Sequence, residues 1–291
     1  MTYAYPIDIQ LPRELTRALQ LPLRLTAEVA NILATASRQI LLHYNSVEIA
    51  RVDRKDDNSP ITEADRAAHH ILYDALLALC PNIPVLSEES TEVQIAKRRQ
   101  WQSCWLVDPL DGTREFIDRT DEFTINVALI WQSRAVLGFI LLPVSHELYI
   151  GAVGVGAWRC TPDACKPLRV RQLDVLSPLG VLASVRHSDA KVSAVLKRLD
   201  GVCSGTERIN AGSAVKFCRL VDAEADIYPR TSPCYEWDVA AGDALVTAAG
   251  GFVRNAAGQP MCYNERDTLL VEHFVAGADS SLDWAGKLYP V

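Results

Sequence analysis

Two aspartates stand three positions apart in the segment 108–113, Asp-Pro-Leu-Asp-Gly-Thr. The segment follows the short apolar run 105–107, which predicts a strand, and its proline and glycine favour a tight turn. Such a turn can direct both carboxylates and the Leu110 carbonyl at one point, and hard divalent cations prefer an all-oxygen set of this kind. Backbone N–H groups after Gly112 would lie at a helix start, where a phosphate can bind. The pattern is also typical of an ordinary turn.

Other acidic residues occur at positions where they could join this pair. Glu88 follows another short apolar run, and Asp238 stands at the start of a predicted helix. Asp65 comes three residues after Thr62, a spacing that indicates a capping box with Asp in place of Glu. Each of these residues also has a plain structural interpretation, as part of a solvated acidic loop, as an N-cap or as part of the capping box.

The elements that must position these residues are indicated by hydrophobic periodicity. A helical period predicts long helices over 23–43 and 62–79, and the alternation then changes to that of successive strands. A polar loop over 51–60 and a junction over 160–178 separate the patterned segments. The further predicted elements are strands over 123–130, 135–142, 147–151, 181–185, 225–228 and 271–276, and helices over 188–199, 213–220 and 238–249.

Composition and charge narrow the class of protein. The chain has 291 residues, of which 49% are hydrophobic and 22% charged, so we expect a packed core. The net charge of −7 argues against binding a nucleic acid polymer. No secretory signal or transmembrane run is visible, so we expect a cytoplasmic protein whose eight cysteines are reduced and mostly buried.

Five segments together resemble one known group of enzymes. The segments 108–113 and 237–242 resemble the two signatures of the inositol monophosphatase superfamily. The members of this superfamily are lithium-sensitive, magnesium-dependent phosphatases. The segments 57–65, 85–89 and 212–218 resemble its 3'(2'),5'-bisphosphate nucleotidase branch, of the bacterial CysQ type. The resemblance extends over about residues 25–275.

The resemblance implies a site for two to three Mg²⁺ ions. Glu88, Asp108 and the Leu110 carbonyl would hold a first ion, and Asp108, Asp111 and Asp238 a second. Glu88 would also reach a third, more weakly bound ion. The physical argument agrees, because carboxylates this close repel one another unless cations neutralise them.

The resemblance also implies catalytic and substrate-binding residues. Thr113, hydrogen-bonded to Asp65, would accept the proton of the attacking water. Lys216 would neutralise the second phosphate of the substrate and His187 would hydrogen-bond it, although a solvated lysine and a surface histidine are the plain alternatives. Where the family often has Ser-x-Ser-His, this chain has Arg186 before the histidine. The implied substrate-binding set is Glu88, Leu110, Asp111, Gly112, Thr113, Ser184, His187, Gly212, Lys216, Arg230 and Asp238.

These observations predict an α/β layered sandwich, with alternating layers of helices and mixed or antiparallel sheets in two lobes. The expected parts are an N-terminal extension over 1–22, a metal-binding lobe over 23–160 and a nucleotide-binding lobe over 165–291. The expected reaction is hydrolysis of the 3'-phosphate of adenosine 3',5'-bisphosphate, with phosphoadenylyl sulfate as a second substrate. The resemblance implies that this reaction clears a by-product of sulfate assimilation. An inositol or sugar monophosphatase is the nearest alternative, and a non-catalytic binding protein is another. Peripheral contact with the cytoplasmic face of the inner membrane is left open.

Overall fold

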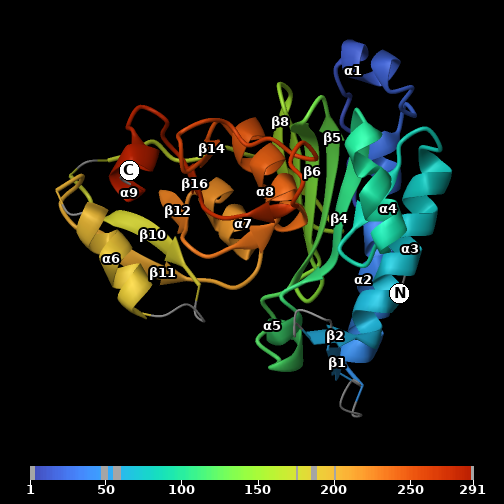
Figure 1. Cartoon of the computed structure of the whole chain (residues 1–291), viewed down its shortest axis with the longest axis horizontal. Coiled ribbons are helices and arrows are strands. Elements are labelled where there is room, and N and C mark those ends of the chain that lie inside the picture. The colour runs from blue at the N-terminus through green and yellow to red at the C-terminus, as the bar shows by residue number, and fades with distance from the viewer. Residues whose placement is uncertain are drawn as a thin grey trace.

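The chain folds into alternating layers of helices and sheets, as predicted (Figure 1). The structure is a computed structural model. It describes residues 4–46, 52–54, 60–174, 176–184, 189–199 and 201–289.

Two long helices form the first layer. They are α2 (Leu25–Tyr44) and α3 (Glu63–Leu79), and both predicted helices are confirmed to within two residues at each end. In α2 the residues Val29, Leu33 and Ile40 are fully buried, because they recur on the face that packs against α3 and the sheet beyond it.

A seven-stranded sheet forms the second layer. Strand order follows chain order, and only the first pair of strands is parallel. The two central strands, over 124–131 and 134–142, are almost continuously apolar, which is expected where helices cover both faces of a sheet. Its strands are β3 (Val85–Ser87), β4 (Ser103–Asp111), β5 (Thr124–Trp131), β6 (Arg134–Leu142), β7 (Glu147–Ala152), β8 (Gly156–Cys160) and β9 (Cys165–Leu168).

The helices α7 (Val215–Val221) and α8 (Glu236–Ala248) form a middle layer between the two large sheets (Figure 1). Glycines allow α8 to lie very close to the first sheet. A Cβ atom on Gly138 or Gly151 would come within 2.3 Å of the α8 backbone. The close approach fixes the middle of α8 against β6 and β7.

A five-stranded mixed sheet forms the fourth layer, in the order β11-β10-β12-β16-β14. The outer helices α6 (Asp189–Leu199) and α9 (Trp284–Leu288) cover its far side. Its strands are β10 (Leu179–Ala183), β11 (Thr206–Asn210), β12 (Ile227–Arg230), β14 (Phe252–Asn255) and β16 (Phe274–Gly277).

Two sequence predictions about strands are wrong. The single strand expected over 271–276 is two strands, because β15 (Leu270–Val271) pairs with β13 (Cys234–Tyr235) whereas β16 joins the five-stranded sheet. The expected polar loop over 51–60 contains paired strands, β1 (Val52–Arg54) and β2 (Pro60–Thr62).

Short helices complete the described chain. The first follows buried N-terminal residues, since Tyr5 and Ile9 join the core under α2, and the Ile9 backbone N–H donates to Thr26 Oγ1 at 2.8 Å. The short helices are α1 (Arg13–Ala18), α4 (Glu92–Lys97), the 3₁₀ helix η1 (Arg98–Gln100) and α5 (Thr113–Ile117). Among the described residues, no helix has both the length and the apolar character needed to cross a membrane.

The expectation that all eight cysteines are reduced is wrong for one pair. Cys160 and Cys165 form a disulfide, with their Cα atoms 4.0 Å apart. They lie directly opposite each other on β8 and β9, at a position where neighbouring antiparallel strands bring side chains closest. The β9 strand also extends the first sheet to Leu168, and the division into lobes between 160 and 165 stays a prediction.

Candidate active site

The turn after β4 brings the first acidic residues together. Asp108 is 1% exposed, and its Oδ1 accepts the Leu110 backbone N–H at 3.0 Å. The register of β4 against β5 shifts between Asp108 and Asp111, so the second carboxylate is turned toward the first. Gly112 has φ of +92° before α5, a conformation that glycine adopts without strain.

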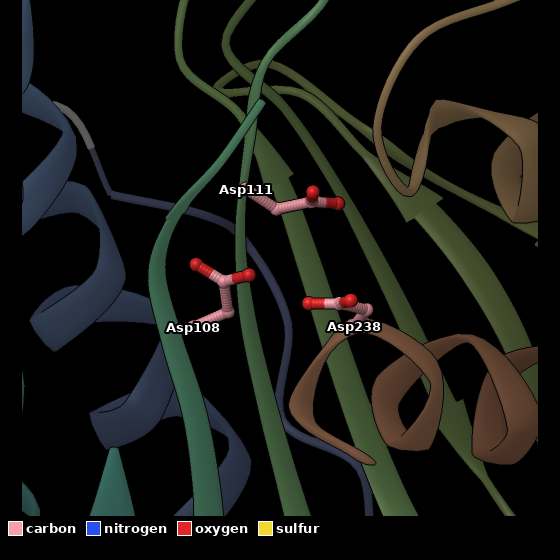
Figure 2. A group of neighbouring side chains, drawn as sticks. All are labelled: Asp108, Asp111 and Asp238. Carbon is pink, nitrogen blue, oxygen red and sulfur yellow. The ribbon is translucent and has the colours of Figure 1, made fainter. Parts of the chain in front are cut away.

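Three carboxylates converge from two layers (Figure 2). Asp108 and Asp111 come from the end of β4, and Asp238 comes from the first turn of α8. Oxygen atoms of the three side chains lie within 4.8 Å of one another, so the cluster could hold a metal ion. The Asp238 side chain is also oriented by the Tyr235 backbone N–H, which donates to Oδ2 at 2.9 Å.

Burial and mutual repulsion raise the pKa values of this cluster. Burial raises the pKa of Asp108 well above its ordinary value, and the negative charges of Glu88 and Asp111 add to the effect. Burial and Asp111 raise the pKa of Asp238 to about 7. Since a bound cation would offset this repulsion, the donor set fits a hard divalent cation.

Three donors fix the orientation of Asp111. Its Oδ2 accepts the Ser213 hydroxyl at 2.7 Å, the Ala214 backbone N–H at 2.7 Å and Asn126 Nδ2 at 3.3 Å. The Ser213 hydroxyl also lies 2.7 Å from Thr124 Oγ1. The carboxylate is therefore held by β5 and by the segment that leads into α7.

Glu88 lies beside this cluster. It follows β3, the parallel neighbour of β4, and its backbone N–H donates to the Val107 carbonyl at 3.0 Å. Its negative charge contributes to the raised pKa of both Asp108 and Asp238. The three-carboxylate cluster defined by distance does not include it.

The predicted pair of Asp65 and Thr113 is in contact. Thr113 Oγ1 donates to Asp65 Oδ1 at 3.3 Å and lies 3.4 Å from the Leu110 carbonyl oxygen. Asp65 Oδ2 accepts the Thr62 backbone N–H at 2.8 Å, which completes the predicted capping box of α3. Asp65 is 3% exposed, so this carboxylate is positioned on both of its oxygens.

A cavity of about 220 Å³ opens next to the carboxylates. Several of its lining residues were not expected from the sequence, among them Arg114, Ser213 and Tyr228. Ser213 lies within the segment 212–218 that carried the resemblance, so the sequence did contain a signal for it. The predicted site residues that line the cavity are Asp111, Gly112, Ser184, Lys216, Arg230 and Asp238.

Three cationic residues line the cavity, Arg114, Lys216 and Arg230, and the last two also bond to its walls. Lys216 is 2% exposed, and its Nζ donates to the Ser213 carbonyl at 2.7 Å and lies 5.3 Å from the centre of the Tyr228 ring. Burial lowers the pKa of Lys216 to about 8. Arg230 Nε donates to the Ser232 carbonyl at 3.0 Å.

Four other described residues of the predicted substrate-binding set do not line this cavity: Glu88, Leu110, Thr113 and Gly212. The Gly212 backbone N–H donates to Glu122 Oε2 at 2.8 Å. Glu122 and Asn126 were missed by sequence reasoning, because neither stands in a recognisable motif. His187 and Arg186 lie outside the described residues.

The layered fold and the buried acidic site define a class of protein, and similarity to known proteins identifies that class. The model of the "Inositol monophosphatase family" matches residues 23–283, and the chain belongs to this family. It is 40% identical to "3'(2'),5'-bisphosphate nucleotidase CysQ" of Escherichia coli K12 over 246 residues, which are 84% of this chain and 95% of the relative. The protein of the same name from Salmonella typhimurium is 39% identical over 243 residues, again 84% and 95% of the two chains.

Solved structures agree with this assignment. The crystal structure of CysQ from Bacteroides thetaiotaomicron matches with a TM-score of 0.71 and 35% identity, and it covers 84% of this chain and 93% of that one. An inositol monophosphatase from Anabaena matches with a TM-score of 0.69 at 21% identity, covering 96% and 97% of the two chains, and supports the fold alone.

Proposed function

We propose that the protein hydrolyses the 3'-phosphate of adenosine 3',5'-bisphosphate to give AMP and phosphate, and acts on phosphoadenylyl sulfate as a second substrate. The observation that carries the proposal is the cluster of three carboxylates beside a cavity that Lys216 and Arg230 line. The 40% identity to proteins named 3'(2'),5'-bisphosphate nucleotidase supports the choice of substrate.

We assign the acidic cluster to two or three Mg²⁺ ions. Glu88, Asp108 and the Leu110 carbonyl would hold one ion, and Asp108, Asp111 and Asp238 another. When bound, such ions would lower the pKa of the attacking water and stabilise negative charge on the phosphate. The all-oxygen donor set and the raised pKa values of Asp108 and Asp238 support this assignment.

The proton of the attacking water would pass to this chain's own residues. Thr113 would accept it while donating its hydroxyl hydrogen to Asp65, and the 3.3 Å contact between Thr113 Oγ1 and Asp65 Oδ1 supports this direction of transfer. The Thr62 backbone N–H holds the other Asp65 oxygen at 2.8 Å, so the accepting oxygen keeps its orientation toward Thr113.

The cationic side of the cavity would bind the second phosphate. Lys216 and Arg230 would supply the positive charge, and Ser184 and His187 would complete the set. Gly212, which bonds to Glu122 outside the cavity, would act on its wall. Because Lys216 is buried and bonded to backbone carbonyls, it would act mainly by charge and by holding the cavity wall. We place the reaction in the cytoplasm, and contact with the inner membrane stays a prediction.

Phosphate release from two substrates tests the proposal. Adenosine 3',5'-bisphosphate and inositol 1-phosphate are each offered with Mg²⁺ and with EDTA. We expect phosphate release to be much faster from the nucleotide than from the inositol ester in Mg²⁺, and to stop in EDTA. A preference for the inositol ester would keep the metal chemistry and refute the substrate, whereas release that persists in EDTA would refute the metal site.

A further inference from the structure

A fully buried glutamate stands two residues before Asp238. Glu236 is 0% exposed and is the first residue of α8. Its Oε2 accepts the Asn264 backbone N–H at 2.7 Å, and its Oε1 lies 3.3 Å from Arg266 Nη2. The Glu236 backbone N–H donates to the Leu269 carbonyl at 2.9 Å. Both the backbone and the side chain of Glu236 therefore connect the start of α8 to the segment 264–269.

The same segment is held from the other side by a buried arginine. Arg98 is 2% exposed, and its Nη2 donates to the Arg266 and Asp267 carbonyls at 2.7 Å. Arg98 Nη1 donates to Asn264 Oδ1 at 3.2 Å, and Asn264 Nδ2 returns a bond to the Arg98 carbonyl at 2.7 Å.

This network joins the connection between β3 and β4 to the start of α8 through the segment 264–269. Along the chain, Arg98 lies in η1, ten residues after Glu88 and ten before Asp108. Glu236 stands two residues before Asp238. Neither Arg98 nor Glu236 lines the cavity of the site. Burying charged groups is unfavourable unless good hydrogen bonds offset the loss of water, and the bonds of Arg98 and Glu236 supply that offset.

We propose that Glu236 is a positioning residue for the metal site, which through Asn264 and Arg98 holds the start of α8 so that Asp238 keeps its distance from Asp108 and Asp111. The inference rests on the proposed function, since it takes the carboxylate cluster as the metal site. A carboxylate cluster binds a cation only when its oxygens stay close against their own repulsion, and a firmly held helix start supplies that constraint.

Glu236→Gln tests the proposal with little change of shape. Glutamine keeps an oxygen for the Asn264 backbone N–H but removes the negative charge next to Arg98 and Arg266. The Mg²⁺ concentration that gives half of the metal-induced rise in Tm is measured without substrate, alongside Mg²⁺ activation of phosphate release. We expect this half-maximal concentration to rise about 10-fold, with kcat largely restored at high Mg²⁺.

Asp222→Asn is the matched control. Asp222 is another largely buried carboxylate, which accepts the Tyr149 hydroxyl at 2.6 Å and Arg159 Nη1 at 3.1 Å, and it lies at the far end of α7. This variant should lose stability and leave the half-maximal Mg²⁺ concentration within twofold of wild type. An equal increase in both variants would overturn the proposal, because general loosening would then explain it.

The remaining outcomes distinguish failure of the metal site from failure of the positioning role of Glu236. A wild-type protein with no metal-induced rise in Tm refutes the metal site and with it the proposed function. A rise in wild type that Glu236→Gln leaves unchanged refutes only the positioning role. If Glu236→Gln does not fold, Arg266→Gln removes the half-exposed partner instead, and we expect about a threefold increase. An unchanged value in that variant would overturn the proposal.

Discussion

Replacing Asp65 by asparagine separates two roles that one carboxylate has in this structure. Asp65 Oδ2 accepts the backbone N–H and the hydroxyl of Thr62, at 2.8 and 2.5 Å, and so caps α3. Asp65 Oδ1 accepts the Thr113 hydroxyl at 3.3 Å. Asparagine keeps one carbonyl oxygen for Thr62 but presents an NH₂ group to Thr113, so Thr113 could no longer pass a proton to this side chain.

The expected effects on the two roles differ greatly in size. Losing an N-terminal cap costs about 0.5–2 kcal/mol, and because the cap bonds survive in Asp65→Asn we expect less than about 1 kcal/mol. Losing a proton acceptor costs about 10²–10⁴-fold in rate. At saturating Mg²⁺ and adenosine 3',5'-bisphosphate, kcat should therefore fall at least about 100-fold, while the free energy of unfolding in urea changes little.

Thr91→Ala is the control for capping alone. Thr91 forms the capping box of α4, with its Oγ1 accepting the Gln94 backbone N–H at 3.4 Å. It should lose about 1 kcal/mol of stability and keep kcat within twofold. The reasoning is refuted if Asp65→Asn keeps kcat within threefold of wild type, or if Thr91→Ala loses as much activity as Asp65→Asn.

Four further changes test other parts of the structure. Asp108→Asn should reduce phosphate release at least about 10³-fold and abolish the Mg²⁺-induced rise in Tm, with the circular dichroism spectrum retained; near-full activity would contradict the metal assignment. Burial and the neighbouring carboxylates raise the pKa of Asp238 to about 7. The metal-free protein should therefore lose stability as pH rises from about 4 to about 7, and the Mg²⁺-induced rise in Tm should grow over the same interval. Gly138→Ala places a Cβ 2.3 Å from the Ala241 carbonyl oxygen and should cost at least about 1–3 kcal/mol in denaturant unfolding. Reducing the disulfide between Cys160 and Cys165 should lower the free energy of unfolding by about 2 kcal/mol. The loss is modest because this disulfide closes only a short loop of the unfolded chain.

The parts of the site that could be predicted are those set by local sequence. Asp108 and Asp111 share one turn, and the residues between them determine its shape, so the convergence of their carboxylates follows from the segment itself. The capping box of Thr62 and Asp65 is likewise local, and the structure confirms it. Asp238 reaches the same point only through α8, and its assignment came from the resemblance.

The parts that could not be predicted depend on contacts between distant segments. Asn126 and Ser213 bond to Asp111 from β5 and from the loop before α7, and no spacing in the sequence relates the three. The predicted strand over 271–276 contains Glu272 and His273 between its apolar residues. Its division into β15 and β16 is established by their two different strand partners. The disulfide partner of Cys160 follows from strand register, which the sequence does not display.

The helix α8 is buried almost all the way round, since it lies between both large sheets. The apolar surface of α8 therefore packs against both sheets, and removing either sheet would expose part of that surface to water. We accordingly expect the chain to unfold in a single cooperative transition, in which neither half of the sequence keeps its structure alone. The arrangement also makes the geometry of the acidic site depend on the whole fold, because its third carboxylate stands on a helix that is buried only when both sheets are present.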